Sequence, residues 1–213
     1  MINLYCTQKL IAKLPVNEGL LPEGEQLQAS LVAGGEEVLS NNPLSGWHAN
    51  LLTLQRRNCV LLVHNQTRFP VVMIGLTKKD FAALDYHFSD CLMNTLLKVG
   101  ANEEQMHAAQ ALLAPVSINK SNDRSVQGTL NQMSGDIEHI LWYDNAQIID
   151  CSPYKTAAWL ADRPCSVKSR KKGAAKSAKD TIWPVDAMLS LLEENFNFNG
   201  VSKAISVVKQ ENV

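Results

Sequence analysis

The chain has 213 residues, of which 46% are hydrophobic and 19% are charged, and its formal net charge is −1. This length predicts one large domain, or one domain with an appendage, whose core needs no disulfide or metal to be stable. The near-neutral charge excludes a chain that is basic or acidic throughout, and no window reaches the roughly 18 apolar residues of a membrane span.

Positive charge is nevertheless concentrated in one segment. Residues 166–179 contain six basic residues and no acidic one, which leaves 14 basic against 21 acidic residues, a balance of −7, elsewhere. The five cysteines form no CxxC pair, and their odd number indicates a reducing compartment. The N-terminal sequence MINLYCTQKL lacks the pattern of a signal peptide. We therefore expect a cytoplasmic protein with an acidic body and one basic segment.

The first part of the chain predicts a strand and a short helix. INLYC, at 2–6, is typical of a strand, and Thr7 is expected to cap a brief amphipathic helix, QKLIAKL, that Pro15 ends. Residues 16–46 are rich in Gly, Pro, Asn and Glu, with one weak helical pattern at 26–39. This stretch is expected to be mainly loop.

Three segments rich in Val, Leu and Ile predict the centre of a sheet. They are WHANLLTLQ (47–55), NCVLLVHNQ (58–66) and FPVVMIGL (69–76). Short polar breaks separate them, so these strands should run antiparallel, because a parallel pair needs a long crossover. His48 and His64 fall on neighbouring strands of this group and could come close.

Helical periodicity is the main signal in the next part of the chain. Apolar residues recur at helical spacing over 77–99, and a second helix is expected over 102–113. A short strand, VSINKS, then precedes the clearest helix, over 122–143, whose cap lies among residues 121–123.

The helix over 122–143 has two different faces. Its apolar stripe consists of Val126, Leu130, Met133, Ile137 and Ile140. The same spacing recurs about half a turn away in Arg124, Gly128, Asn131, Gly135 and Glu138. A glycine inside a helix costs about 1 kcal/mol relative to alanine. We therefore expect Gly128 to allow the close approach of a backbone, a neighbouring strand or a ligand.

The C-terminal part completes the expected organisation. QIIDC, at 147–151, resembles a strand, and PYKTAAWLA, at 153–161, a helix. The basic run over 166–181 has no apolar periodicity and predicts a flexible linker, followed by a helical segment, 182–213, that packs back. The expected fold is a single α+β domain over 1–165, an antiparallel sheet of four to five strands packed by helices.

A few residues are candidates for function. For catalysis they are Asp123, Arg124 and His48, because an arginine at a helix start can hold a phosphate or carboxylate beside the free backbone N–H groups. A plain cap and an ordinary ion pair are the favoured explanation of Asp123 and Arg124, because helix caps are common and anion sites are few. The candidate binding residues are Arg124, Gly128, Asn131, Lys168, Arg170, Lys171 and Lys172. The sequence contains neither a metal-ligand spacing nor a cofactor motif.

A resemblance is carried by WHANLLTLQRRNCVLLVHNQTRFPVVMIGL, NDRSVQGTLNQM, LADRPCS and IWP. These stretches resemble a family of small uncharacterised bacterial proteins, cytosolic, with a domain of unknown function and often encoded near mobile or plasmid-borne genes. The resemblance covers about residues 1–165, its most specific part is NDRSVxGxxN, and the basic segment 167–180 looks like an extension. The family carries no assigned activity, so the resemblance implies only that residues 122–131 are a signature.

Three classes of function follow from these patterns. The first is a non-catalytic binding module for a protein partner or a nucleic acid, in a mobile-element, stress or defence context. A basic arm has the charge and reach for phosphates, although this one has no aromatic residue for base stacking and a solvated linker explains it equally well. The second is a small hydrolase or nuclease using Asp123, Arg124 and a histidine. The third is a structural subunit of a homo-oligomer, with Gly128 and Gly135 at a helix–helix contact.

Overall fold

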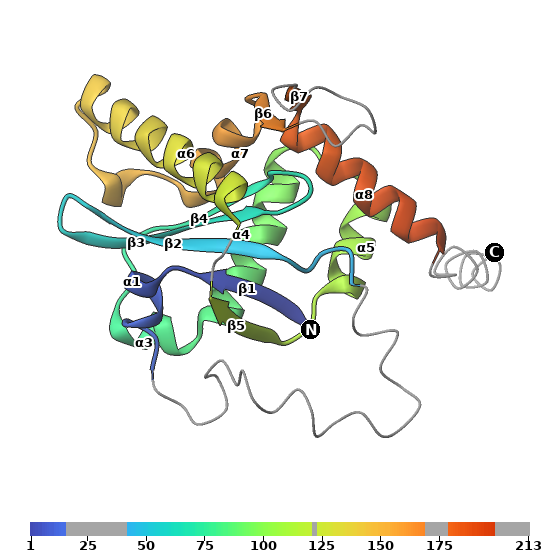
Figure 1. Cartoon of the computed structure of the whole chain (residues 1–213), viewed down its shortest axis with the longest axis horizontal. Coiled ribbons are helices and arrows are strands. Elements are labelled where there is room, and N and C mark those ends of the chain that lie inside the picture. Colours follow the sequence, from blue (N-terminus) through green and yellow to red (C-terminus); the bar gives the residue numbers. More distant parts are fainter. Residues whose placement is uncertain (16–41, 121–122, 169–178, 199–213) are drawn as a thin grey trace, which may run out of the picture.

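A five-stranded mixed sheet lies at the centre of the chain, whose computed structural model describes residues 1–15, 42–120, 123–168 and 179–198 (Figure 1). Its strands are β1 (Ile2–Cys6), β2 (Trp47–Leu54), β3 (Arg57–His64), β4 (Pro70–Met73) and β5 (Val116–Lys120), in the order β4-β3-β2-β1-β5. β2, β3 and β4 form antiparallel pairs, as their short connections predict.

β1 makes the sheet mixed, because it pairs in parallel with β2 on one side and with β5 on the other. The expected sheet was antiparallel throughout, and this half of it differs. Long connections permit the parallel pairs: 40 residues separate β1 from β2, and three helices lie between β4 and β5. The carboxyl ends of β1 and β5 therefore lie at the same edge of the sheet.

Helices cover both faces of the sheet. They are α1 (Gln8–Ile11), α3 (Lys78–Ala82), α4 (Leu84–Lys98), α5 (Glu103–Leu112), α6 (Arg124–Tyr143), α7 (Pro153–Ala161) and α8 (Pro184–Phe198), with a 3₁₀ turn, η2 (Ile148–Asp150). Figure 1 shows α6 in front of the sheet and α4 behind it. The described residues thus form a single α+β domain, as expected.

Each face of the sheet has its own apolar core. On the side of α4, α5 and α8, the core includes Trp47, Phe88 and Leu92, all fully buried. On the side of α6 and α7, Leu61 and Val63 of β3 meet the apolar stripe of α6. Four of the five residues predicted for that stripe, Val126, Leu130, Met133 and Ile137, are buried, and Ile140 is half-buried at a pocket.

Several elements differ from the sequence-based expectation. The helix predicted over 77–99 is divided at Ala83, whose φ of −116° and ψ of 37° are not helical. The strand expected at 147–151 is a 3₁₀ turn, because Ile148 donates its backbone N–H to Gln55 Oε1 at 2.7 Å instead of pairing with a strand. The weak helical pattern at 26–39 lies outside the described residues.

The two ends of the expected linker 166–181 form strands instead. β6 (Cys165–Lys168) pairs antiparallel with β7 (Lys179–Ile182). Residues 169–178 lie outside the described residues. The C-terminal helix begins with Pro184 at its first turn and packs on α5, so the segment 182–213 does return to the domain over its described part.

Candidate functional site

The sheet face toward α6 is apolar on one half and polar on the other. α6 packs on β2 and β3. The polar residues of β1, β2 and β5 that point to this side are Asn3, Tyr5, His48, Asn50, Ser117 and Asn119. Their apolar neighbours along each strand lie in the opposite core. We call these six residues the polar sheet face, and except for buried His48 they are half-buried.

The polar sheet face is held by strand register and local contacts. Tyr5 lies level with His48 on one side and with Asn119 on the other. The rings of Tyr5 and His48 are tilted by 34° with their centroids 5.0 Å apart. At the carboxyl end of β1, Thr7 Oγ1 donates a hydrogen bond to Asn50 Oδ1 at 3.0 Å.

Asp123 begins α6 at the edge of this face. Its Oδ1 accepts hydrogen bonds from the backbone N–H groups of Ser125 at 2.7 Å and Val126 at 3.2 Å, which is N-cap geometry. Partial burial raises the pKa of Asp123, but these N–H donors, the charge of Arg68 and the charge that His48 carries only in acid outweigh it, so the pKa is lowered. Asp123 is therefore a carboxylate at neutral pH.

Arg68 supplies a buried positive charge beneath the helix start. It lies in the turn between β3 and β4, is 2% exposed, and has a φ of +61°, in the left-handed region that few non-glycine residues adopt. Its Nη2 donates to Ser125 Oγ at 3.1 Å. The backbone of the turn is thus held in an unusual conformation that places a guanidinium under α6.

His48 is kept neutral by its surroundings. Burial lowers its pKa, the Asp123 carboxylate raises it, and the Arg68 charge lowers it, with a net decrease from 6.5. A neutral imidazole can both donate and accept a hydrogen bond. The structure therefore brings a neutral histidine, a carboxylate and a guanidinium together at the start of α6.

A pocket of about 350 Å³ opens beside this group. It lies between the start of α1, β2 and the exposed side of α6. Its lining residues include Thr7, Lys9, Asn50 and Asn131. Its lining side chains are mostly polar, but much of the surface that they present is apolar carbon, so the pocket suits a ligand with both polar and apolar parts.

The antiparallel pair of β6 and β7, which we call the basic hairpin, begins close to Arg68. Arg68 lowers and Asp136 raises the pKa of the Cys165 thiol, although burial is the largest influence and the net pKa is raised. Just before β6, Arg163 Nη1 lies 3.0 Å from Asp136 Oδ2 on α6. Arg163 also stacks on Trp159, 3.8 Å from the ring centroid. These contacts fix the base of the hairpin against α6.

The candidate catalytic residues are only partly brought together. His48 and Asp123 lie within electrostatic reach of each other, whereas His64 points to the opposite side of the sheet, against Trp47. Arg124 is exposed on the first turn of α6. Of the basic binding candidates, Lys168 ends β6, and Arg170, Lys171 and Lys172 lie outside the described residues.

No backbone or strand of the described part of the chain approaches Gly128 closely, and the close approach of a ligand there stays a prediction. Arg124, Gly128, Asn131 and Gly135 are all exposed. A Cβ atom added to Gly128 or Gly135 would meet nothing within 4 Å. This line of α6 is open to solvent, so sheet packing does not explain its glycines.

Two residues of the site were missed from the sequence. Tyr5 faces His48 only because β1 pairs in parallel with β2. The local sequence around Tyr5 contains no signal of that pairing. Arg68 stands in a short polar break between two predicted strands, a place where an arginine is usually exposed. Its position directly before the buried Phe69-Pro70 pair was the available signal.

The described residues contain neither a metal-binding cluster nor a membrane-spanning helix. No group of three or more histidine, cysteine, aspartate or glutamate side chains in these ranges is arranged to hold a metal ion. No helix in the same part of the chain is long and apolar enough to cross a membrane.

Comparison with known proteins identifies a family. A family model described as a domain of unknown function (DUF6933) matches residues 3–187, and the chain belongs to this family. The match runs past residue 165, so it extends through the basic segment that the resemblance set apart. No curated protein matches the chain.

Proposed function

We propose that this member of the family is a non-catalytic binding module for nucleic acid, in the mobile-element, stress or defence context that the resemblance implies. The position of Arg68 carries the proposal. Its charge acts on Asp123 at the start of α6 and on Cys165 at the start of β6. The helix start and the basic hairpin therefore share one side of the molecule.

Side chains rather than backbone groups would contact the phosphates. Asp123 already accepts from the first N–H groups of α6. Arg124 is exposed on the same turn, and Gly128 and Asn131 continue an open line along the helix. Lys168 is the last residue of β6, and Arg170, Lys171 and Lys172 follow it in the sequence, so we propose that these four residues supply further positive charge. Such contacts give affinity with little sequence preference.

The test is the salt dependence of DNA binding. Fluorescence anisotropy of a short labelled duplex is measured with the full chain between about 50 and 200 mM salt, where phosphate contacts weaken steeply. Neutralising Lys168, Arg170, Lys171 and Lys172 to glutamine should weaken binding by roughly tenfold or more. Salt-independent binding, or none at the lowest salt, would contradict the proposal.

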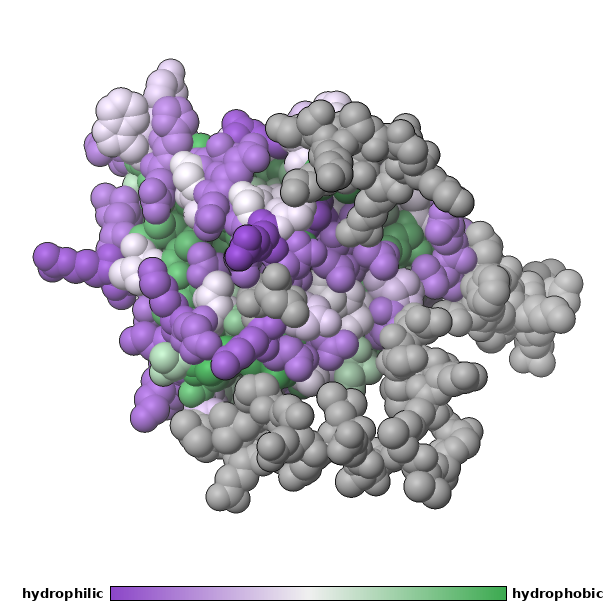
Figure 2. Space-filling view, in the orientation of Figure 1, coloured by the Kyte–Doolittle hydropathy of each residue, from purple (hydrophilic) through white to green (hydrophobic). Residues whose placement is uncertain are grey.

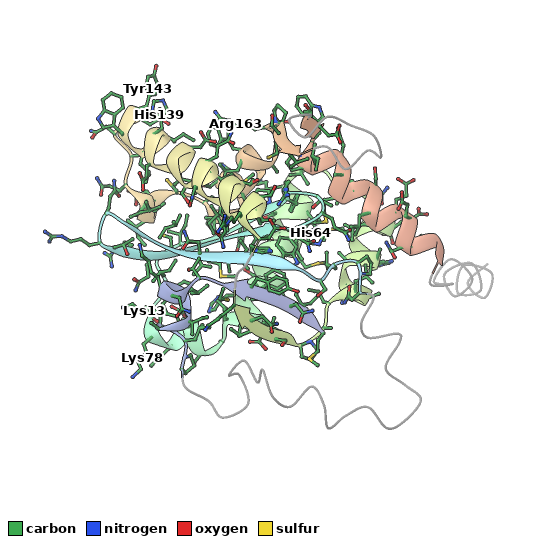
Figure 3. All side chains as sticks on the ribbon, in the orientation of Figure 1. Lys13, His64, Lys78, His139, Tyr143 and Arg163 are labelled. Carbon is green, nitrogen blue, oxygen red and sulfur yellow. The ribbon has the colours of Figure 1, made fainter. Side chains whose placement is uncertain are left out.

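A matched control uses lysines elsewhere on the surface. Lys78 and Lys79 are exposed on α3, and Figure 3 shows Lys78 on the far side of the sheet from Arg163. Replacing both with glutamine lowers the positive charge but should leave the affinity nearly unchanged. An equal loss in this variant would show that only net charge matters.

A small hydrolase or nuclease is the second candidate function. One observation favours it: His48 lies against Tyr5 and within electrostatic reach of Asp123, and Asn50, two residues along β2 from His48, lines the neighbouring pocket. A neutral histidine near a carboxylate can act as a general base. If the full chain cleaves the same labelled duplex, and both His48→Gln and Asp123→Asn abolish the cleavage, this function is favoured over binding alone.

A structural role in a homo-oligomer is the third candidate. The exposed line that contains Gly128 and Gly135 would let a second helix approach closely. Light scattering that shows a monomer at high concentration would remove this candidate.

A further inference from the structure

The pocket beside the start of α1 lies at the edge of the sheet where two parallel strands end. β1 and β5 are adjacent and parallel, so both have their carboxyl ends at this edge. The helices that follow them lie on opposite faces: Leu10 of α1 belongs to the core on the side of α4, whereas Leu130 of α6 belongs to the other core. Open α/β sheets hold ligands in the crevice at such a point. The topology therefore indicates a binding position at this edge.

The pocket is built by three elements that meet at this edge. Residues 7–9, directly after β1, form one side, Gln127, Leu130 and Asn131 of α6 form the other, and Asn50 of β2 completes the lining. Figure 2 shows hydrophobic side chains lying among hydrophilic ones on the face below α6. The volume of about 350 Å³ is at the small end of the range for ligand pockets, about 300–1,000 Å³. One small molecule, about the size of a nucleotide, fits such a space.

Positive charge is in excess on the elements that line the pocket. Lys9 is a lining residue, and residues 1–15 contain a second lysine, Lys13, and no acidic residue. β2 contains no acidic residue either. Over 124–135, α6 contains Arg124 and no acidic residue. The lining itself has one cation and no carboxylate, so its charge favours an anionic ligand.

The two carboxylates of α6 nearest to this stretch are already engaged. Asp123 accepts hydrogen bonds from the first N–H groups of the helix and feels the charge of Arg68. Asp136 lies 3.0 Å from Arg163. Neither of them lines the pocket. An anion in the pocket would therefore meet Lys9 without an opposing carboxylate in the lining.

Hydrogen-bond donors are available in the pocket. Asn50 Oδ1 accepts from Thr7 Oγ1 at 3.0 Å, and no described residue accepts from the NH2 group of Asn50. Lys9 has no carboxylate partner in the same part of the chain. Asn131 is exposed on α6 and offers a second amide, a group that can pair with the edge of a nucleobase. The buried side chain of Leu130 adds an apolar contact.

We propose that this pocket binds a single nucleotide, a nucleoside monophosphate. The phosphate meets Lys9, and the base lies over Leu130. The amides of Asn50 and Asn131 bond the polar edge of the base. A nucleotide combines the anionic group, the polar edge and the apolar ring face that this lining matches, whereas an inorganic anion would use Lys9 alone. A free nucleotide and the terminal nucleotide of a strand share this chemistry.

This site differs from the surface proposed to bind duplex phosphates. That surface consists of Arg124, the open line of α6 and the basic hairpin, and only Asn131 belongs to both. Lys9 and Asn50 lie on other elements. The inference does not rest on the proposed nucleic-acid binding, because the chain can bind a mononucleotide without binding a duplex, and either can fail alone.

The probe is adenosine monophosphate, titrated into the full chain and followed by calorimetry. We expect it to bind, and adenosine, which lacks the phosphate, to bind about tenfold more weakly. Inorganic phosphate should also bind more weakly than adenosine monophosphate, because it makes no contact with the amides or with Leu130. The proposal is overturned if adenosine monophosphate does not bind, or if either part of it binds as tightly as the whole.

Variants at exposed positions locate the binding and assign the contacts. Lys9→Gln should weaken adenosine monophosphate by about tenfold and leave adenosine unchanged. Asn131→Ala should weaken both ligands several-fold. The matched control is Lys13→Gln, which removes the same charge outside the lining and should bind both like the wild type; Figure 3 shows Lys13 on the side of the sheet away from α6. Equal losses in Lys9→Gln and Lys13→Gln would overturn the proposal.

A labelled single strand with a terminal phosphate distinguishes the two sources of the nucleotide. If adenosine monophosphate displaces the strand from the full chain, and Lys9→Gln weakens both, the pocket holds the end of a strand. If adenosine monophosphate binds in the pocket and displaces no strand, the pocket holds a free nucleotide. Displacement that is the same in Lys9→Gln and the wild type would place the nucleotide elsewhere and overturn the proposal.

Discussion

Arg68 Nη2 donates a hydrogen bond to Ser125 Oγ at 3.1 Å, joining residues 57 positions apart. The bond links the turn between β3 and β4 to the first turn of α6. Because the guanidinium is buried, its charge is felt by His48 and Asp123. One side chain therefore both fixes the helix start on the sheet and sets the electrostatics of the candidate site.

Arg68→Met should change the titration of His48. Removing the guanidinium takes away a charge that lowers the pKa of His48, so that pKa should rise toward its usual value of 6.5. NMR titration of the imidazole measures it. Arg57→Met, an exposed change at the start of β3, is the control and should leave the titration unchanged. An unshifted His48 in Arg68→Met would show that the two side chains are not coupled.

Two substitutions at Asp123 separate the stabilisation that comes from its N-cap hydrogen bonds from that of its negative charge. Asparagine is as good an N-cap as aspartate, whereas alanine is not. Asp123→Ala should therefore lower the free energy of unfolding by about 1 kcal/mol, and Asp123→Asn by only a few tenths. Urea denaturation measures both. Equal losses in the two variants would mean that the charge, through Arg68 and His48, matters more than the cap.

Gly128→Ala should stabilise the protein. The new Cβ meets nothing within 4 Å, and alanine is favoured over glycine inside a helix by about 0.5–1 kcal/mol. The contrasting variant is Gly46→Ala, where φ is +93° and the Cβ would lie 2.5 Å from Asn65 Nδ2, so this change should destabilise. Thermal unfolding compares the two. A destabilised Gly128→Ala would indicate a contact made outside the described chain.

Local patterns in the sequence predicted the elements that local forces determine. The spacing of apolar residues placed α6 and α7 within a residue or two of their observed bounds, and short polar breaks predicted the antiparallel pairs of β2, β3 and β4. The parallel pairs of β1 escaped prediction, because β5 lies more than 100 residues away along the chain. Such a pairing depends on the whole fold.

The candidate site was predicted only in part, because some of its residues come together through the overall fold and not through local sequence. Asp123 and His48 were named from their residue types and positions, and they do lie near each other. Tyr5 and Arg68 complete the group only through the parallel pairing and a left-handed turn. The glycine line of α6 was found by its spacing, but spacing alone does not reveal which side faces solvent, and no backbone of the described chain packs against it.

His64 is the basis of a further prediction, about pH. It is fully buried, and its Nε2 lies 3.0 Å from the carbonyl oxygen of Ser45, which can only accept. Nε2 therefore carries the proton, and Nδ1 accepts from the Thr67 hydroxyl at 3.0 Å. Burial lowers the pKa of His64 to about 4, while the unfolded chain has the ordinary value of 6.5.

The folded state should therefore lose stability as the pH falls below about 6.5, because the unfolded state binds a proton that the folded His64 does not. At about pH 5 the loss from this residue is about 2 kcal/mol, and it continues down to about pH 4. Urea denaturation at about pH 7 and pH 5 measures it. In His64→Gln, which keeps a donor and an acceptor but cannot titrate, the difference between the two pH values should shrink by most of this amount. His48, whose pKa is also lowered, contributes to the pH dependence that remains in this variant. A pH dependence identical to that of the wild type would show that His64 is not the group that binds the proton on unfolding.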